Sequence, residues 1–203
     1  MAQKPINKKE HIIKAATEHF SNYGYEATSL DNIAKACGIT KPAIYYHFQD
    51  KAALYEIVLL RHFDRLNARI NQGTDADDPR QALQGYIEAF GSYLIEVPTF
   101  SATLSREIAN GGKGLPDSCI SSLSQTLNRL SSILEKGKVE GFFVCENPFM
   151  IQMMIVTTLT AYITTRPLRE RVYHHLGRPD WIDPDMTDVI TSLSDKIIKA
   201  LAC

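Results

Sequence analysis

The chain has 203 residues, of which 44% are hydrophobic and 22% are charged, and its formal net charge is −1. This length and composition suffice for a packed core, either as one domain or as a small domain joined to a larger one. The near-neutral charge excludes the overall basic signature that is usual in nucleic-acid binders. Residues 1–51 nevertheless carry slightly more lysine than acid, and the remainder slightly more acid.

The four cysteines are scattered along the chain, without a C-x-x-C pair or a histidine at metal-ligand spacing. They are Cys37, Cys119, Cys145 and Cys203. This usage predicts a reduced, cytoplasmic setting, and we interpret Cys37 as a small buried residue, with a redox switch as the alternative. The N-terminal MAQKPINKKEH is polar and lacks a signal-peptide pattern. The longest uncharged run, residues 147–165, contains proline, glutamine and several threonines, which favours a buried helix over a membrane span.

Almost every segment shows the 3.6-residue period of an amphipathic helix, and no alternating strand pattern is found, so we predict an all-α fold. The first helix is expected from about residue 7 to Tyr23, with Gly24 as its C-terminal stop. A second helix is expected to begin at Thr28. The Thr28 side chain would cap this helix, and Asp31 would complete a capping box.

Gly38 is expected to end the second helix after only a few turns. Thr40 is then expected to cap a third helix, with Pro42 in the first turn, where its missing N–H costs nothing. A longer fourth helix is predicted from Asp50 towards Ile70, where a polar turn follows. Three short helices therefore precede a long one.

Apolar residues recur at helical spacing in three later segments, residues 83–97, 123–134 and 185–201, and Pro98 is expected to end the first of them. A nearly uncharged helix is predicted around residues 148–163. This helix and the final one each show more apolar surface than one buried face requires. We therefore predict a homodimer in which they pair with a symmetry mate as a four-helix bundle. The GGKGLP stretch lacks P-loop spacing and is interpreted as a loop.

A helix, a short glycine-containing turn and a second helix form the helix-turn-helix motif, whose second helix enters the major groove of DNA. Ile44 and Phe48, four residues apart, are expected to pack on the preceding helix. The outward face would then consist of Thr40, Lys41, Pro42, Ala43, Tyr45, Tyr46 and His47. Its hydroxyl, ammonium and small apolar groups suit phosphates and base edges, and the alternative is a solvated aromatic patch. Thr28 and Lys51, at helix starts, are also expected to contact phosphates.

The stretch TSLDNIAKACGITKPAIYYHFQDKAALY, residues 28–55, resembles the DNA-binding domain of TetR-family transcriptional regulators, and the resemblance begins at about residue 12. It implies an all-α homodimer whose larger domain binds a small effector, usually as a repressor that the effector releases. By this resemblance Thr28, Thr40, Tyr45, Tyr46, His47 and Lys51 contact phosphate or sugar, whereas Lys41, Pro42 and Ala43 face bases. The chain departs from the family pattern at Cys37 and Pro42, so base specificity is not carried over.

Tyr86 and Tyr93 recur seven residues apart beside the main apolar stripe of their segment. We predict an effector cavity that accepts a mainly apolar molecule, lined by Tyr86, Phe90, Tyr93, Phe143 and Met150. For each of these residues, a place in the core is the alternative.

The resulting prediction is a helix-turn-helix DNA-binding domain at residues 1–51 and a helical effector-binding and dimerisation domain at residues 52–203. Its partners would be double-stranded DNA with a palindromic operator, a small-molecule effector and a second copy of the chain, but no membrane. We predict no catalytic residue, no cofactor and no metal site, and interpret His174 and His175 as surface residues because adjacent helical side chains diverge. Two alternatives remain: a carrier or enzyme with a helix-turn-helix scaffold, and a non-specific architectural DNA binder.

Overall fold

The structure is a computed structural model that describes residues 7–178 and 180–203, so residues 1–6 of the expected first domain lie outside it. The described chain is helical and contains no strand, which confirms the predicted fold class; one isolated antiparallel bridge joins Phe143 to Ala202. The helices are α1 (Lys8–Ala27), α2 (Leu30–Ala36), α3 (Lys41–Tyr45), α4 (Lys51–Gly73), α5 (Pro79–Glu96), α6 (Pro98–Ala109), α7 (Asp117–Val139), α8 (Pro148–Thr164), α9 (Arg166–His175) and α10 (Met186–Leu201).

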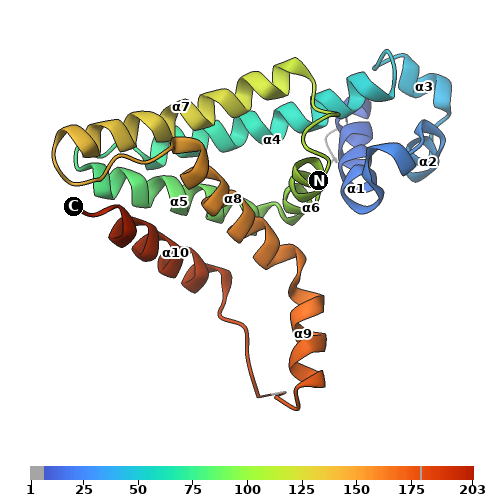
Figure 1. The fold of residues 1–203 in the computed structure, drawn as a ribbon. Coiled ribbons are helices and arrows are strands. Elements are labelled where there is room, and N and C mark those ends of the chain that lie inside the picture. The colour runs from blue at the N-terminus through green and yellow to red at the C-terminus, as the bar shows by residue number, and fades with distance from the viewer. Residues whose placement is uncertain (1–6, 179) are drawn as a thin grey trace, which may run out of the picture.

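Helices α1 to α3 gather at one end of the molecule, and the long helix α4 runs from this group into the larger helical body (Figure 1). Within the body, α4 packs against both α5 and α7, and α10 packs on α5. Helix α6 contacts α1 as well as α8. The elements that carry α1 to α3 are therefore α4 and α6.

The first helix ends as predicted at Gly24, whose φ of 79° lies in the left-handed region that glycine tolerates, although a further turn extends to Ala27. The predicted cap of the second helix is wrong. Ser29, not Thr28, accepts the hydrogen bond from the Asn32 backbone N–H and is the N-cap of α2. The difference is only one residue, but as a result the Thr28 side chain is buried and does not cap α2.

The predicted helix at residues 83–97 corresponds to α5, and Pro98 both ends it and begins α6. Helix α6 is not among the predicted elements, although Phe100, Leu104 and Ile108 follow the i, i+4, i+8 spacing. Helix α9 is not among them either. Consequently the two helices expected to pair with a symmetry mate are α8 and α10, with α9 between them.

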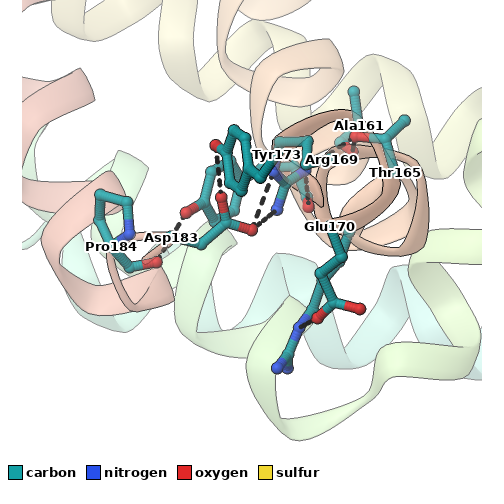
Figure 2. Close-up of polar contacts among 9 residues, drawn as sticks. Ala161, Thr165, Arg169, Glu170, Tyr173, Asp183 and Pro184 are labelled. Atoms are coloured by element: carbon teal, nitrogen blue, oxygen red, sulfur yellow. Dashed lines mark hydrogen bonds and ion pairs between the residues drawn. The ribbon is translucent and has the colours of Figure 1, made fainter. Parts of the chain in front are cut away.

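Helix α8 packs against the body, α9 extends from its end as an arm, and the chain then returns to α10 (Figure 1). A polar cluster fixes this return (Figure 2). The Arg169 guanidinium donates to the Asp183 carboxylate at 2.8 and 3.0 Å, and the Tyr173 hydroxyl donates to the other oxygen at 2.9 Å. Arg169 also donates to the Tyr162 carbonyl at 2.7 Å, so one guanidinium links α8, α9 and the segment before α10.

Helices α4 and α5 cross so closely that only glycine fits at the crossing. A Cβ on Gly85 would lie 1.9 Å from the Gly73 carbonyl oxygen, which is backbone and cannot rotate away. We expect Gly85→Ala to lower the free energy of unfolding by about 3 kcal/mol through overpacking. Chemical denaturation measures this loss. The exposed position Gln81 on the same helix provides the control, since Gln81→Ala should change stability by less than about 0.5 kcal/mol.

Candidate nucleic-acid interface and effector site

The recognition helix α3 is only five residues long and is held by its buried face. Ile44 is fully buried and Phe48 is 3% exposed, as the spacing predicts. Gly38, with a φ of 64°, provides the turn from α2. Because the inner face is fixed by packing, the opposite face is presented in one orientation.

The outward face of α3 carries the aromatic run that the sequence places there. Tyr46 is 85% exposed and Tyr45 is 50% exposed, and neither hydroxyl makes a hydrogen bond within the described residues. Thr40 and Pro42 are also exposed, whereas Lys41, Ala43 and His47 are half-buried. The structure thus brings these seven predicted residues together on and beside one short helix. Rings exposed to this extent offer edges and hydroxyls to a partner, since they contribute little to the core.

Lys41 contacts an acidic side chain from the neighbouring helix, which the analysis of α3 alone does not reveal. Its Nζ lies 2.8 Å from the Asp31 carboxylate, and both side chains are exposed. This hydrogen bond raises the pKa of Lys41, so the ammonium stays charged. An exposed pair of this kind is weak, and a DNA phosphate can compete for the ammonium.

Thr28, which is predicted to contact DNA, is buried in this structure. Thr28 is 2% exposed, and its hydroxyl donates to the Gly24 carbonyl at 2.7 Å. Its backbone N–H donates to the Tyr25 carbonyl. Both donors are therefore used inside the domain, where they close the end of α1.

Lys51 holds the same end of α1 from the first turn of α4. Its ammonium donates to the Tyr25 carbonyl at 2.9 Å and the Thr28 carbonyl at 3.2 Å, and it lies 4.1 Å from the Tyr25 ring centroid. Two of its three N–H donors are thus used within the domain. The third is available for a phosphate, and this contact stays a prediction.

The larger helical body contains a mainly apolar cavity of about 450 Å³. This volume lies in the range of sites that accept small molecules. Residues of α4, α5, α6, α7 and α8 line it, among them Phe63, Phe90, Leu104, Leu127, Met153 and Val156. Two polar lining residues are Glu107 on α6 and Gln152 on α8.

Of the five predicted effector residues, Phe90 lies on the wall of this cavity, and the structure places the other four elsewhere. Tyr86 is fully buried behind the wall, where its hydroxyl donates to Gln152 Oε1 at 2.6 Å. Phe143 packs on Gly137, and Met150 is 55% exposed on α8. Helical spacing shows which of these side chains share a face of a helix. It does not show whether that face meets the cavity or other parts of the core.

Tyr93, the remaining predicted residue, pairs with a buried histidine that sequence reasoning does not identify. Its hydroxyl lies 2.9 Å from His62 Nδ1, and the His62 ring stacks on Phe100. Burial lowers the pKa of His62 to about 4 and raises the pKa of Tyr93 to about 12. Both groups are therefore neutral near pH 7, and the pair is a structural contact between α4 and α5.

Glu107 and Arg106, near the end of α6, are also missed by sequence reasoning. The Tyr55 hydroxyl donates to Glu107 Oε1 at 2.5 Å, and burial and this carboxylate raise the pKa of Tyr55. Tyr55 in turn packs on Phe20 of α1, with ring centroids 4.7 Å apart. An acidic residue within the apolar pattern of residues 100–108 is the sequence signal that identifies Glu107 as unusual.

Arg106 binds the end of α1 directly. Its guanidinium donates to the Asn22 carbonyl at 2.9 Å, to the Phe20 carbonyl at 3.4 Å and also to the Ser21 carbonyl. These carbonyls precede Gly24, where the regular helix ends, and a cation is favourable at a helix C-terminus. Helix α6 therefore borders the cavity through Leu104, Glu107 and Ile108 and holds α1 through Arg106.

Two other predicted features concern metals and membranes. Within residues 7–178 and 180–203, no group of three or more His, Cys, Asp or Glu side chains is arranged to hold a metal ion, and His174 and His175 are exposed. No single helix in this part of the chain is long and apolar enough to cross a membrane. Helices α8 and α9, bent by 64° at their junction, meet the length and composition criteria only as a pair.

A short helix with an exposed aromatic face, which follows a glycine turn and packs on the preceding helix, is the arrangement of a helix-turn-helix DNA-binding protein. The family model described as bacterial regulatory proteins, tetR family, matches residues 12–58. The transcriptional activator FasR of Mycolicibacterium smegmatis is 38% identical over 88 residues, which are 43% of this chain and 40% of that protein. The regulator RutR of Escherichia coli K12 is 27% identical over 165 residues, 81% of this chain and 78% of the relative.

Solved structures agree over nearly the whole chain. The TetR-family regulator PfmR of Thermus thermophilus superposes with a TM-score of 0.71 at 26% identity, covering 93% of this chain and 97% of that one. Residues 12–58 therefore carry the DNA-binding domain of the TetR family, and the chain as a whole has the fold of a TetR-family regulator. FasR, RutR and PfmR are each described as transcriptional regulators.

The buried histidine gives the stability of the protein a specific pH dependence. His62 has a pKa of about 4 when folded and about 6.5 when unfolded, so the unfolded chain binds the proton first as pH falls. We expect the free energy of unfolding to be fully maintained above pH 6.5 and to fall by about 3 kcal/mol by pH 4. Denaturation at a series of pH values measures this slope. His62→Gln should lack this part of the slope, whereas His11→Gln, at an exposed position, should retain it.

Proposed function

We propose that the protein is an effector-responsive, sequence-specific regulator, acting as a repressor that a mainly apolar small molecule releases from a palindromic operator. Residues 1–51 would bind DNA and residues 52–203 would bind the effector and dimerise, in the cytoplasm. The exposure of Tyr46 on a recognition helix with a buried opposite face carries this proposal. A ring exposed in this way adds little to stability and suits contact with the DNA backbone.

The residues around α3 divide into two kinds of contact. Tyr45, Tyr46, His47 and Thr40 offer hydroxyl and ring N–H donors and are proposed to bind phosphate or sugar, with Lys51 behind them. Lys41, Pro42 and Ala43, in the first turn, are proposed to approach the base edges. The absence of an N–H from Pro42 leaves its ring to make apolar contacts, of the kind that a thymine methyl offers.

A dimer is proposed because α8 and the arm expose apolar side chains. Met150 and Met154 on α8 are 55% and 40% exposed, and Val172 and Leu176 on the arm are also exposed. Helix α10 buries its apolar side against α5. Its exposed side is mainly polar. We therefore assign α8 as the apolar part of the interface, with α10 as its polar neighbour. A two-fold axis there would present two α3 helices to successive half-sites.

We propose that α6 transmits effector binding to the DNA-binding helices. Glu107 borders the cavity and holds Tyr55 of α4, while Arg106 holds the end of α1. A ligand that shifts α6 therefore acts on both supports of the recognition helix. To release the operator effectively, effector and DNA binding need a coupling free energy of about 1–3 kcal/mol.

Selection from random duplex DNA tests the proposed function. We expect the purified protein to enrich a palindromic sequence with half-sites about one helical turn apart, because two copies of α3 are related by a two-fold axis. Sequencing of the bound pool measures the enrichment. Recovery of unselected sequence alone would contradict specific DNA binding and would favour a helix-turn-helix that serves as a scaffold.

Variants of the exposed face test which side chains bind that DNA. Tyr46→Ala should weaken operator binding about tenfold through loss of a hydrogen bond and ring contacts, without loss of stability. Lys41→Gln should also weaken binding, and Lys51→Gln should reduce the salt slope by about one, because Lys51 is the cation proposed to contact phosphate. Fluorescence anisotropy at several salt concentrations measures both effects. Tyr23→Ala, an exposed tyrosine of α1 away from α3, is the control, and an equal loss there would argue against the assigned face.

The dimer is tested by placing a charge in the assigned interface. Met154→Arg should shift the protein from dimer to monomer at micromolar concentration, because it buries an unpaired charge only when two copies associate. Sedimentation velocity measures the change. Gln125→Arg, on the exposed side of α7, should leave the dimer intact. A wild-type monomer under the same conditions would contradict the proposal.

A further inference from the structure

The cavity contains a buried carboxylate that the protein satisfies only in part. Glu107 is 6% exposed and stands between the cavity and a second hollow against the end of α1, lining both, and its Oε1 accepts the hydrogen bond from Tyr55. Its Oε2 is buried and makes no hydrogen bond within the described residues. A buried carboxylate with one oxygen unpaired is costly, so this oxygen indicates a place for a donor that the protein does not supply.

Glu107 has no ion-pair partner in the described chain, although Arg106 and Lys113 line the second hollow beside it. Among residues 7–178 and 180–203, no lysine, arginine or histidine forms an ion pair with it. Its neighbour Arg106 points to the carbonyls at the end of α1 instead. A ligand that brings its own positive charge would therefore meet an unpaired acceptor in a mainly apolar surrounding, where a charge-assisted hydrogen bond is strongest.

The remainder of the cavity wall fits an apolar body. Phe63, Phe90, Leu104 and Met153 belong to the lining, and methionine adapts to ligands of different shape. At about 30 Å³ for each heavy atom, as for liquid water, a volume of about 450 Å³ accommodates roughly fifteen heavy atoms. A short alkyl or aryl chain with a single polar head has this size.

We propose that the effector is an amphipathic amine, a protonated amino group on an apolar chain or ring, with its N–H donating to Glu107 Oε2. This assignment rests on the proposed effector-responsive function and names the ligand class for the same cavity. The amine binds the carboxylate on α6 that also holds Tyr55 of α4. Binding at this carboxylate thus acts next to the contact that Arg106 makes with α1.

Three ligands of equal chain length test the proposal on the wild-type protein. They are decylamine, decanol and decanoate, which differ in the charge of the head group, and alkylamines are protonated near pH 7, like lysine. By calorimetric titration below micellar concentrations, we expect decylamine to bind about tenfold more tightly than decanol, the ratio expected between a charged and a neutral hydrogen bond. Decanoate should bind most weakly, since its carboxylate faces Glu107. Equal affinity for the three, or a preference for decanoate, overturns the assignment.

Substitution of the carboxylate gives the second measurement. Glu107→Gln is isosteric and keeps an acceptor for Tyr55, and it should reduce the preference for decylamine over decanol to about twofold or less. The exposed residue Glu88 on α5 lies outside the cavity, so Glu88→Gln should retain the tenfold preference. Retention of the preference in Glu107→Gln overturns the proposed contact.

Operator binding by the same proteins separates this inference from the proposed function. Release of the selected operator by decylamine, and not by decanoate, supports both. Decylamine binding with the expected preference but without any effect on operator affinity supports the ligand assignment and overturns the effector role. Operator binding without any preference for the amine leaves the DNA-binding function standing and overturns the ligand class.

Discussion

The structure depends on two consecutive residues of α6 that hold different parts of the molecule. Arg106 donates to three carbonyls at the end of α1, and Glu107 accepts from Tyr55 of α4. Since α1 packs on α2, α2 packs on α3, and α4 packs on α1, these two residues help to fix the orientation of the recognition helix relative to the body. Both contacts involve charged groups, which make stronger hydrogen bonds than neutral ones and lose more when a partner moves away.

The end of α1 is held from the other side by α4. The ammonium of Lys51 donates to carbonyls there, and Thr28 closes the same turn through its hydroxyl. The carbonyls that a helix leaves free at its C-terminus are thus shared between side chains from both domains. A helix of five residues such as α3 has no stability of its own, so the stiffness of this shared support decides how well it is positioned for DNA.

The sequence is sufficient to predict the helix-turn-helix unit because its signals are local. Gly38, the position of Pro42 and the spacing of Ile44 and Phe48 each constrain the backbone within a few residues. The cavity is not predictable in this way. Periodicity correctly places Tyr86 and Tyr93 in the interior, but a buried tyrosine that satisfies its hydroxyl on Gln152 or His62 has the same spacing as one that faces a ligand.

Helix α6 is missed for a related reason. Its apolar residues continue the pattern of α5 across Pro98, which the sequence analysis interprets only as an end and not also as a beginning. With α6 unassigned, an acidic residue inside an apolar pattern cannot be recognised as buried. The Thr28 error has a different origin, since adjacent Thr and Ser both suit an N-cap and tertiary packing decides between them.

A buried carboxylate with an unpaired oxygen reduces stability, and under the proposed function its position would offset this cost by allowing it to select a ligand. Replacement by a neutral residue would remove the desolvation cost and would also remove any preference among ligands by charge. Because Glu107 contacts α4 directly, a ligand that satisfies its second oxygen changes a group that already supports the recognition helix. The buried carboxylate with the unpaired oxygen and the group that holds Tyr55 of α4 are the same side chain, Glu107. Under the proposed function, a change at the ligand would reach α4 through the single hydrogen bond between Glu107 and Tyr55.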